Sequence, residues 1–112
     1  MLAVLLEIPR DKAAWNRFSF HHRQSHDRIV AAINAKGGQQ LVTYQLDPIN
    51  PDDFESWITR HQQAHVDMDG ALGAQGVDLS DLDPTDERQL IGWIYRNWEE
   101  HTAAENALGI SS

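Results

Sequence analysis

Three stretches of the chain place apolar side chains every three or four residues, the spacing that aligns them along one face of an α-helix. The pattern predicts helices over residues 11–35, 51–72 and 86–108. Each predicted helix begins at a residue that often caps helix N-termini, namely Asp11, Asn50 and Asp86. Each ends at a glycine, which readily adopts the left-handed conformation that closes a helix: Gly37, Gly73 and Gly109. Because Gln89 follows Asp86 by three residues, we also expect a capping box there.

An apolar segment that ends near a proline precedes each helix, over residues 2–8, 41–46 and 77–82. Alternation and composition predict extended structure there, most clearly in LVTYQL. The expected fold class is therefore mainly α, with three amphipathic helices from a repeated extended–proline–helix unit and short strands as an option. A small α+β fold stays open as the alternative. The connectors are long enough to span a helix, so the directions of the helices stay open too.

Residues 37–72 and 73–108 align without a gap at an offset of 36. Identical pairs include Trp57 with Trp93 and His65 with His101. Residues 1–36 fit as a degenerate first copy, at an offset of 39. Self-similarity at a fixed period indicates a duplicated unit. The whole chain, residues 1–112, is predicted to be one domain that contains this repeat.

Polar side chains share the apolar face of each predicted helix. At 100° per residue, the histidines lie in line with the aromatic and aliphatic positions. A buried polar group without a partner costs roughly 1–3 kcal/mol, so these side chains need partners. We expect a structural network of buried polar groups made by His22, His26, His61, His65, Asn97 and His101.

Metal binding and acid–base catalysis are two other ways to satisfy these histidines. Pairs four residues apart bring two imidazoles to one ion, which makes candidate ligands of His22, His26, His61, His65 and His101. No HExxH motif accompanies them, and no glutamate lies on their face except near Glu100. From these residues we assign no metal ligand, cofactor or catalytic residue, and the metal-binding interpretation stays open.

The formal net charge is −8, from 9 lysines and arginines against 17 acidic residues. This charge disfavours nucleic acid and anionic membranes as partners. The chain has no cysteine, which excludes thiolate ligands and disulfides. It also has no apolar run long enough to span a membrane.

The motifs WNRFSFHHRQSH, YQLDPI, FESWITRHQQAH, GVDLSDLD and LIGWIYRNWEEHTAAENALGI resemble small, largely uncharacterised proteins encoded by tailed bacteriophages. The strongest parts are WxxxHQxxH and WxxxNxxEHxxAxxxLGI, and the resemblance covers about residues 10–110. It implies a virion or virion-assembly protein that is made in the host cytoplasm. It carries over no catalytic residue.

The function we expect is therefore a non-catalytic structural or adaptor protein of a bacteriophage virion. It would contact other virion proteins or further copies of itself, as virion parts work in symmetric assemblies. Two alternatives stay open. The first is a histidine-based metal-binding module or metalloenzyme, and the second is a phage regulatory protein that binds a host protein.

Overall fold

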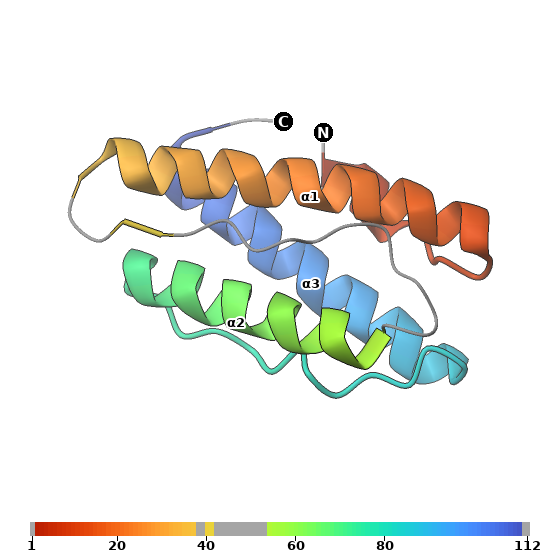
Figure 1. Ribbon diagram of the computed structural model, residues 1–112. Coiled ribbons are helices and arrows are strands. Elements are labelled where there is room, and N and C mark those ends of the chain that lie inside the picture. Colours follow the sequence, from red (N-terminus) through yellow and green to blue (C-terminus); the bar gives the residue numbers. More distant parts are fainter. Residues whose placement is uncertain (1, 38–39, 42–53, 111–112) are drawn as a thin grey trace.

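A computed structural model describes residues 2–37, 40–41 and 54–110 (Figure 1). They form a short 3-10 helix and three α-helices: η1 (Leu2–Leu6), α1 (Lys12–Ala35), α2 (Phe54–Leu72) and α3 (Glu87–Leu108). The predicted mainly α class is confirmed, and no strand occurs in the described part of the chain. The start of the second helix, its cap Asn50 and most of the segment 41–46 lie outside the described residues.

One of the predicted extended segments takes another form. Residues 2–6 coil into η1, which packs on α1 and α3 and buries Leu5 completely. Residues 77–82 have no regular structure, because side chains compete for their backbone groups. The Asp78 carboxylate accepts hydrogen bonds from the Ser80 amide and hydroxyl, at 2.8 Å from the amide. Leu79 is fixed between helices, where its carbonyl accepts from Trp93 Nε1 at 2.7 Å.

The helix ends follow the sequence signals closely. Asp11 Oδ1 accepts from the Ala14 amide at 2.8 Å, and the Asp86 carboxylate caps α3 in the same way. All three predicted C-terminal glycines have positive φ angles. The capping box, however, is wrong. The side-chain oxygen Oε1 of Gln89 accepts a hydrogen bond from the Asp83 backbone amide at 3.0 Å. It does not reach back to the Asp86 amide, because that amide already donates to the Asp83 backbone carbonyl.

All three α-helices run in the same direction (Figure 1). The connector 73–86 travels back along the bundle before α3 begins. Equivalent positions of the three sequence units therefore lie at the same level. Phe18, Trp57 and Trp93 meet near the N-terminal ends, and Ile33 and Leu108 meet near the C-terminal ends.

The apolar core is divided into two parts. An aromatic cluster lies in the N-terminal half and comprises Leu5, Phe18, Trp57, Ile58, Leu79, Leu90, Trp93 and Ile94. An aliphatic cluster lies in the C-terminal half and comprises Ile29, Val30, Ile33, Leu41, Met68, Ala104 and Leu108. Burying each large side chain stabilises the fold by roughly 1.5–3 kcal/mol. The buried histidines and Asn97 lie between these two clusters.

Candidate metal centre

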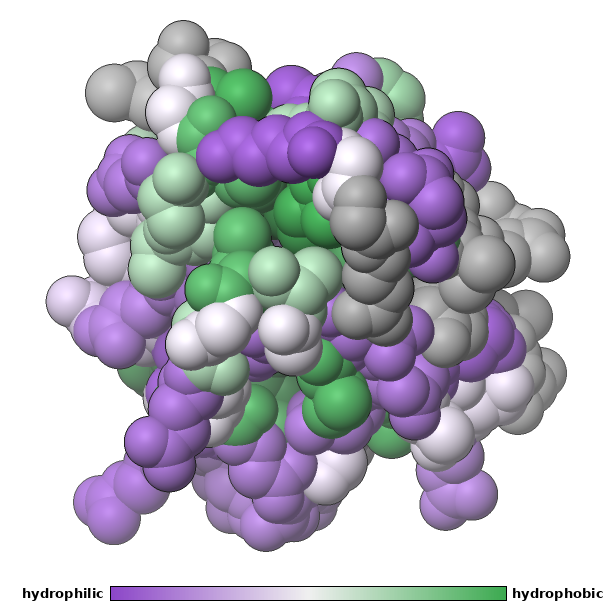
Figure 2. Space-filling view, turned by 90° about the vertical axis from the view of Figure 1, so that its left-hand side faces the viewer, coloured by the Kyte–Doolittle hydropathy of each residue, from purple (hydrophilic) through white to green (hydrophobic). Residues whose placement is uncertain are grey.

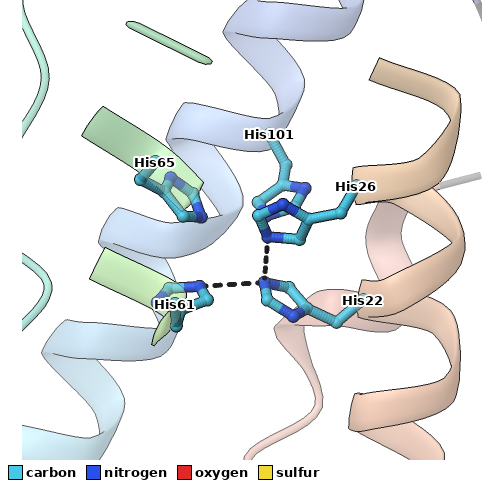
Figure 3. Close-up of side chains that lie close together, drawn as sticks. All are labelled: His22, His26, His61, His65 and His101. Carbon is cyan, nitrogen blue, oxygen red and sulfur yellow. Dashed lines mark hydrogen bonds between the residues drawn. The ribbon is translucent and has the colours of Figure 1, made fainter. Parts of the chain in front are cut away.

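Five histidines from all three helices meet in the middle of the bundle (Figure 3). This histidine cluster comprises His22 and His26 of α1, His61 and His65 of α2, and His101 of α3. One nitrogen from each ring can be chosen so that all five lie within 4.8 Å of one another. Each residue is at most 3% exposed. The sixth histidine, His21, lies outside the cluster with its ring against Phe20.

The donor groups form two stacked triangles, because the helices are parallel and each contributes two positions one turn apart. The first triangle contains His22, His61 and Asn97. Its edges are 3.1 Å between the two Nε2 atoms, 3.1 Å from His22 Nε2 to Asn97 Oδ1, and 3.0 Å from His61 Nε2 to Asn97 Oδ1. The second triangle, one turn further along, contains His26, His65 and His101. An edge of 3.1 Å joins His22 Nε2 to His26 Nε2.

Hydrogen bonds alone cannot satisfy the first triangle. Each of its three atoms presents either a proton or a lone pair to the other two. Two of the three must therefore be alike, whichever tautomers the histidines adopt and whichever way the Asn97 amide is turned. At least one of the three contacts is then repulsive. A cation between the three atoms would remove this conflict, because it attracts a lone pair from each of them.

Aromatic rings of the preceding helical turn hold two of the imidazoles in place. The His22 ring stacks on Phe18, with centroids 4.9 Å apart and an interplanar angle of 16°. The His61 ring stacks on Trp57 at 4.9 Å and 12°. These contacts fix the planes of the two rings. The Nε2 atoms are thereby directed towards each other, while both Nδ1 atoms have no hydrogen-bond partner in the described part of the chain.

A buried serine and a buried glutamate orient His101. Ser25 Oγ donates to Glu105 Oε2 at 2.7 Å and lies 2.7 Å from His101 Nδ1. Arg28 lies 3.5 Å from the same Oε2 atom and forms an ion pair with it. Since the single Ser25 proton goes to Glu105, His101 Nδ1 must donate to Ser25. His101 Nε2 then carries a lone pair, and no described hydrogen-bond donor reaches it.

A pair of carboxyl groups lies beside His65. Glu100 Oε2 is 3.5 Å from His65 Nδ1, and the Glu100 and Asp69 carboxyl groups hydrogen bond to each other. Burial, and after it the hydrogen bond to Glu100 and the charge of Glu100, raises the pKa of Asp69 to about 7. With its Nδ1 towards a carboxylate, His65 presents the lone pair of Nε2 to the cluster. Carboxylates hold metal-bound histidines in this way in many metalloproteins.

Burial disfavours the protonated form of four of the five histidines. Burial, and then the charge of His65, lowers the pKa of His22 to about 3, although the Asn97 hydrogen bond opposes this. Burial also lowers the pKa of His26, His61 and His101 well below the ordinary value, and neighbouring imidazoles lower it further. Neutral imidazole is the form that binds metal ions.

The sequence placed all six polar core residues on the correct helix faces, and each is buried. One expectation was wrong: neither ring nitrogen of His65 makes a hydrogen bond within the described residues. The sequence analysis also missed Ser25, Glu105 and Asp69. Helical spacing carries a signal for two of them, since Ser25 is three residues after His22 and Glu105 is four after His101.

No protein-family model, curated protein or solved structure matches the chain. The resemblance to bacteriophage proteins therefore stays an expectation. Within the described part of the chain, no helix is both long enough and apolar enough to cross a membrane.

Proposed function

We propose that this protein is a metal-binding domain in which one six-coordinate divalent ion joins three parallel helices. Its ligands are the five rings of the histidine cluster and the Asn97 side-chain oxygen. The observation that carries the proposal is the convergence of six donor groups at two levels. Four donor–donor distances are 3.0–3.1 Å: the three edges of the first triangle and the edge that joins it to His26. Two such triangles are opposite faces of a six-coordinate site.

The edge length favours six ligands over four. An octahedron with edges of 3.1 Å has metal–ligand distances of about 2.2 Å, and its opposite donors are about 4.4 Å apart. The latter value fits within the 4.8 Å that spans the five histidines. A tetrahedron with the same edge would need metal–ligand distances of about 1.9 Å, shorter than the Zn–N distances of about 2.0–2.1 Å in zinc sites. Imidazole donors suit iron, nickel, copper and zinc. We infer a six-coordinate ion such as Fe²⁺ or Ni²⁺.

The charges around the cluster suit a dication. All six ligands are neutral, so a bound divalent ion keeps its two positive charges in the core, which is costly unless they are balanced. Two carboxylates lie behind the ligands. Glu100 lies beside His65, Glu105 is linked to His101 through Ser25, and the Arg28 guanidinium pairs with Glu105. The Asp69 and Glu100 carboxyl groups share a proton through their hydrogen bond, so the buried charge around the ligands is negative and offsets part of the ion's charge.

A centre with six protein ligands has no position open for a substrate, so its role is structural. Catalytic metal sites keep such a position for water or substrate, and structural sites close it with protein ligands. Binding would add its free energy to folding, because the site does not exist in the unfolded chain. At a metal concentration about 100 times Kd, the added stability is about 2.7 kcal/mol.

Metal analysis tests the proposal directly. Untagged protein, freed of metal with a chelator, is dialysed against Fe²⁺, Ni²⁺, Co²⁺ or Zn²⁺ and analysed by mass spectrometry for elements. We expect about one equivalent per chain, and X-ray absorption should show six nitrogen or oxygen neighbours at about 2.2 Å. His26→Ala should lose most of the affinity. His21→Ala is the matched control and should bind normally, because His21 lies outside the cluster. Less than about one-tenth of an equivalent with every metal would refute the proposal.

We propose a corresponding role for the chain as a whole, a non-catalytic structural or adaptor protein of a bacteriophage virion. Two points support it: the resemblance carried by the WxxxHQxxH and WxxxNxxEHxxAxxxLGI motifs, and the closed ligand set of the centre. Mass spectrometry of purified particles from a phage that encodes this chain tests it. Absence of the chain from intact particles would contradict this role and leave the metal proposal unaffected.

A further inference from the structure

An ion must cross a layer of protein to reach the histidine cluster. The aromatic cluster closes the bundle on one side of the histidines, with Phe18, Trp57 and Trp93 each at most 1% exposed. The aliphatic cluster closes the other side. Figure 2 shows the end of the bundle beyond the aliphatic cluster, where apolar residues gather in the middle and polar ones surround them. A hydrated dication does not pass through such layers, because they offer it no ligand.

The contact between α1 and α3 is also unsuitable for a cation. There the partly exposed Arg28 guanidinium lies 3.5 Å from the buried Glu105 Oε2. Its positive charge repels an approaching dication at short range. The charge of Arg28 therefore opposes the approach of a cation to the buried Glu105 carboxylate at this contact.

The contact between α2 and α3 offers a continuous line of carboxylate oxygens. A surface pocket of about 410 Å³ opens beside α2, and Asp69 and Asp78 are part of its lining. Asp69 hydrogen bonds to Glu100, and Glu100 Oε2 lies 3.5 Å from the His65 ring. The Glu100 side chain is only 10% exposed, and its Oε2 atom has no hydrogen-bond partner in the described part of the chain. This oxygen faces His65 Nδ1 and so connects the carboxyl pair to the histidine cluster.

The connector covers this carboxyl pair closely. The Val77 amide lies 3.4 Å from Glu100 Oε1. A Cβ atom at Gly76 would overlap Asp69 Oδ2 and lie 3.3 Å from Glu100 Oε1. The absence of a side chain at this position therefore leaves room for the two carboxyl groups between the pocket and the cluster.

We propose that the Asp69–Glu100 pair is the port through which the metal ion enters and leaves the histidine cluster. This inference rests on the proposed metal-binding function. In the port, carboxylate oxygens replace water molecules of the ion one by one before the imidazoles bind it. Asp69 contacts the ion only in transit and is not a ligand in the final site.

A port residue changes the rates of binding and release together, whereas a residue that stabilises the bound ion changes the equilibrium. We therefore compare wild type with Asp69→Asn, using metal-free protein and Ni²⁺ alone at about pH 8, above the pKa of Asp69. Tryptophan fluorescence follows uptake after rapid mixing, and a chelator in excess gives the release rate. We expect both rates to fall by about tenfold, the smaller end of electrostatic steering effects, with Kd unchanged within about twofold.

Asp67→Asn is the matched control. It removes the same charge from α2 at a half-buried position that is not part of the pocket lining, and both rates should stay at wild-type values. Gly76→Ala is a second, independent variant, which crowds the port without removing a charge. It should also slow uptake and release together, and circular dichroism checks that each variant is folded.

Three results would overturn the port. They are unchanged rates in Asp69→Asn, a change confined to release and Kd, or an equal slowing in Asp67→Asn. If wild-type protein binds Ni²⁺ at one equivalent and any of these is found, the port alone fails. If wild-type protein binds none of the tested metals, the proposed function fails and the port falls with it.

Discussion

Mild acid should sharply destabilise the metal-free protein. The perturbation is protonation of the histidine cluster, where burial lowers the pKa of His22 to about 3 and that of His26, His61 and His101 well below the ordinary value. In the unfolded chain the same rings titrate near pH 6.5. Below that pH the unfolded state binds more protons than the folded state, so stability is intact above pH 6.5 and falls as the pH drops.

The magnitude follows from proton counting. At pH 5.5 each unfolded histidine holds about 0.9 proton that its folded counterpart lacks, and the four together lose about 5 kcal/mol relative to pH 7.5. Asp69 acts in the opposite direction. Its pKa, raised to about 7, lets the folded state hold up to one extra proton in this range. Its partial exposure weakens that contribution. The net loss should be about 4 kcal/mol, a large part of the 5–15 kcal/mol that stabilises a typical domain.

Urea unfolding followed by tryptophan fluorescence measures this loss. The titrations are run at several pH values between about 7.5 and 5.5, at fixed ionic strength and with a chelator present. Asp69→Asn should steepen the loss because it removes the opposing group, and His21→Ala should leave it unchanged. A free energy of unfolding that is flat or rises towards pH 5.5 would show that the cluster is not the buried neutral set described above.

Two further variants probe single contacts. Ser25→Ala removes the link between Glu105 and His101, so metal affinity should fall by about 10–100-fold in calorimetric titrations while the metal-free fold stays intact; unchanged affinity would mean that Ser25 does not orient the ligand. Gly109→Ala places a side chain at a φ of 68°, where L residues are disfavoured, so the free energy of unfolding should fall by about 1 kcal/mol. A gain in stability would contradict a left-handed backbone conformation at Gly109.

The sequence by itself determined the local features of this protein. Helical periodicity placed His61 and His65 on the same face as Trp57, because side-chain direction in a helix depends only on the 100° step between residues. The capping residues could also be predicted locally, because Asp11 and Gly109 act on backbone groups of their own helix. The 3-10 form of residues 2–6 was missed, since it depends on packing against α1 and α3.

Only the tertiary structure decided what the histidines do together. Connectors of this length permit parallel or antiparallel helices, and the parallel arrangement alone places His22, His61 and Asn97 at one level. Distances between helices are set by the packing of the aromatic and aliphatic clusters, to which residues from the whole chain contribute. Partners such as Glu105 and Ser25 are 80 residues apart, and no local pattern encodes such a contact. Side-chain direction is thus a property of each helix, while the convergence of six donor groups on one point is a property of the packed bundle.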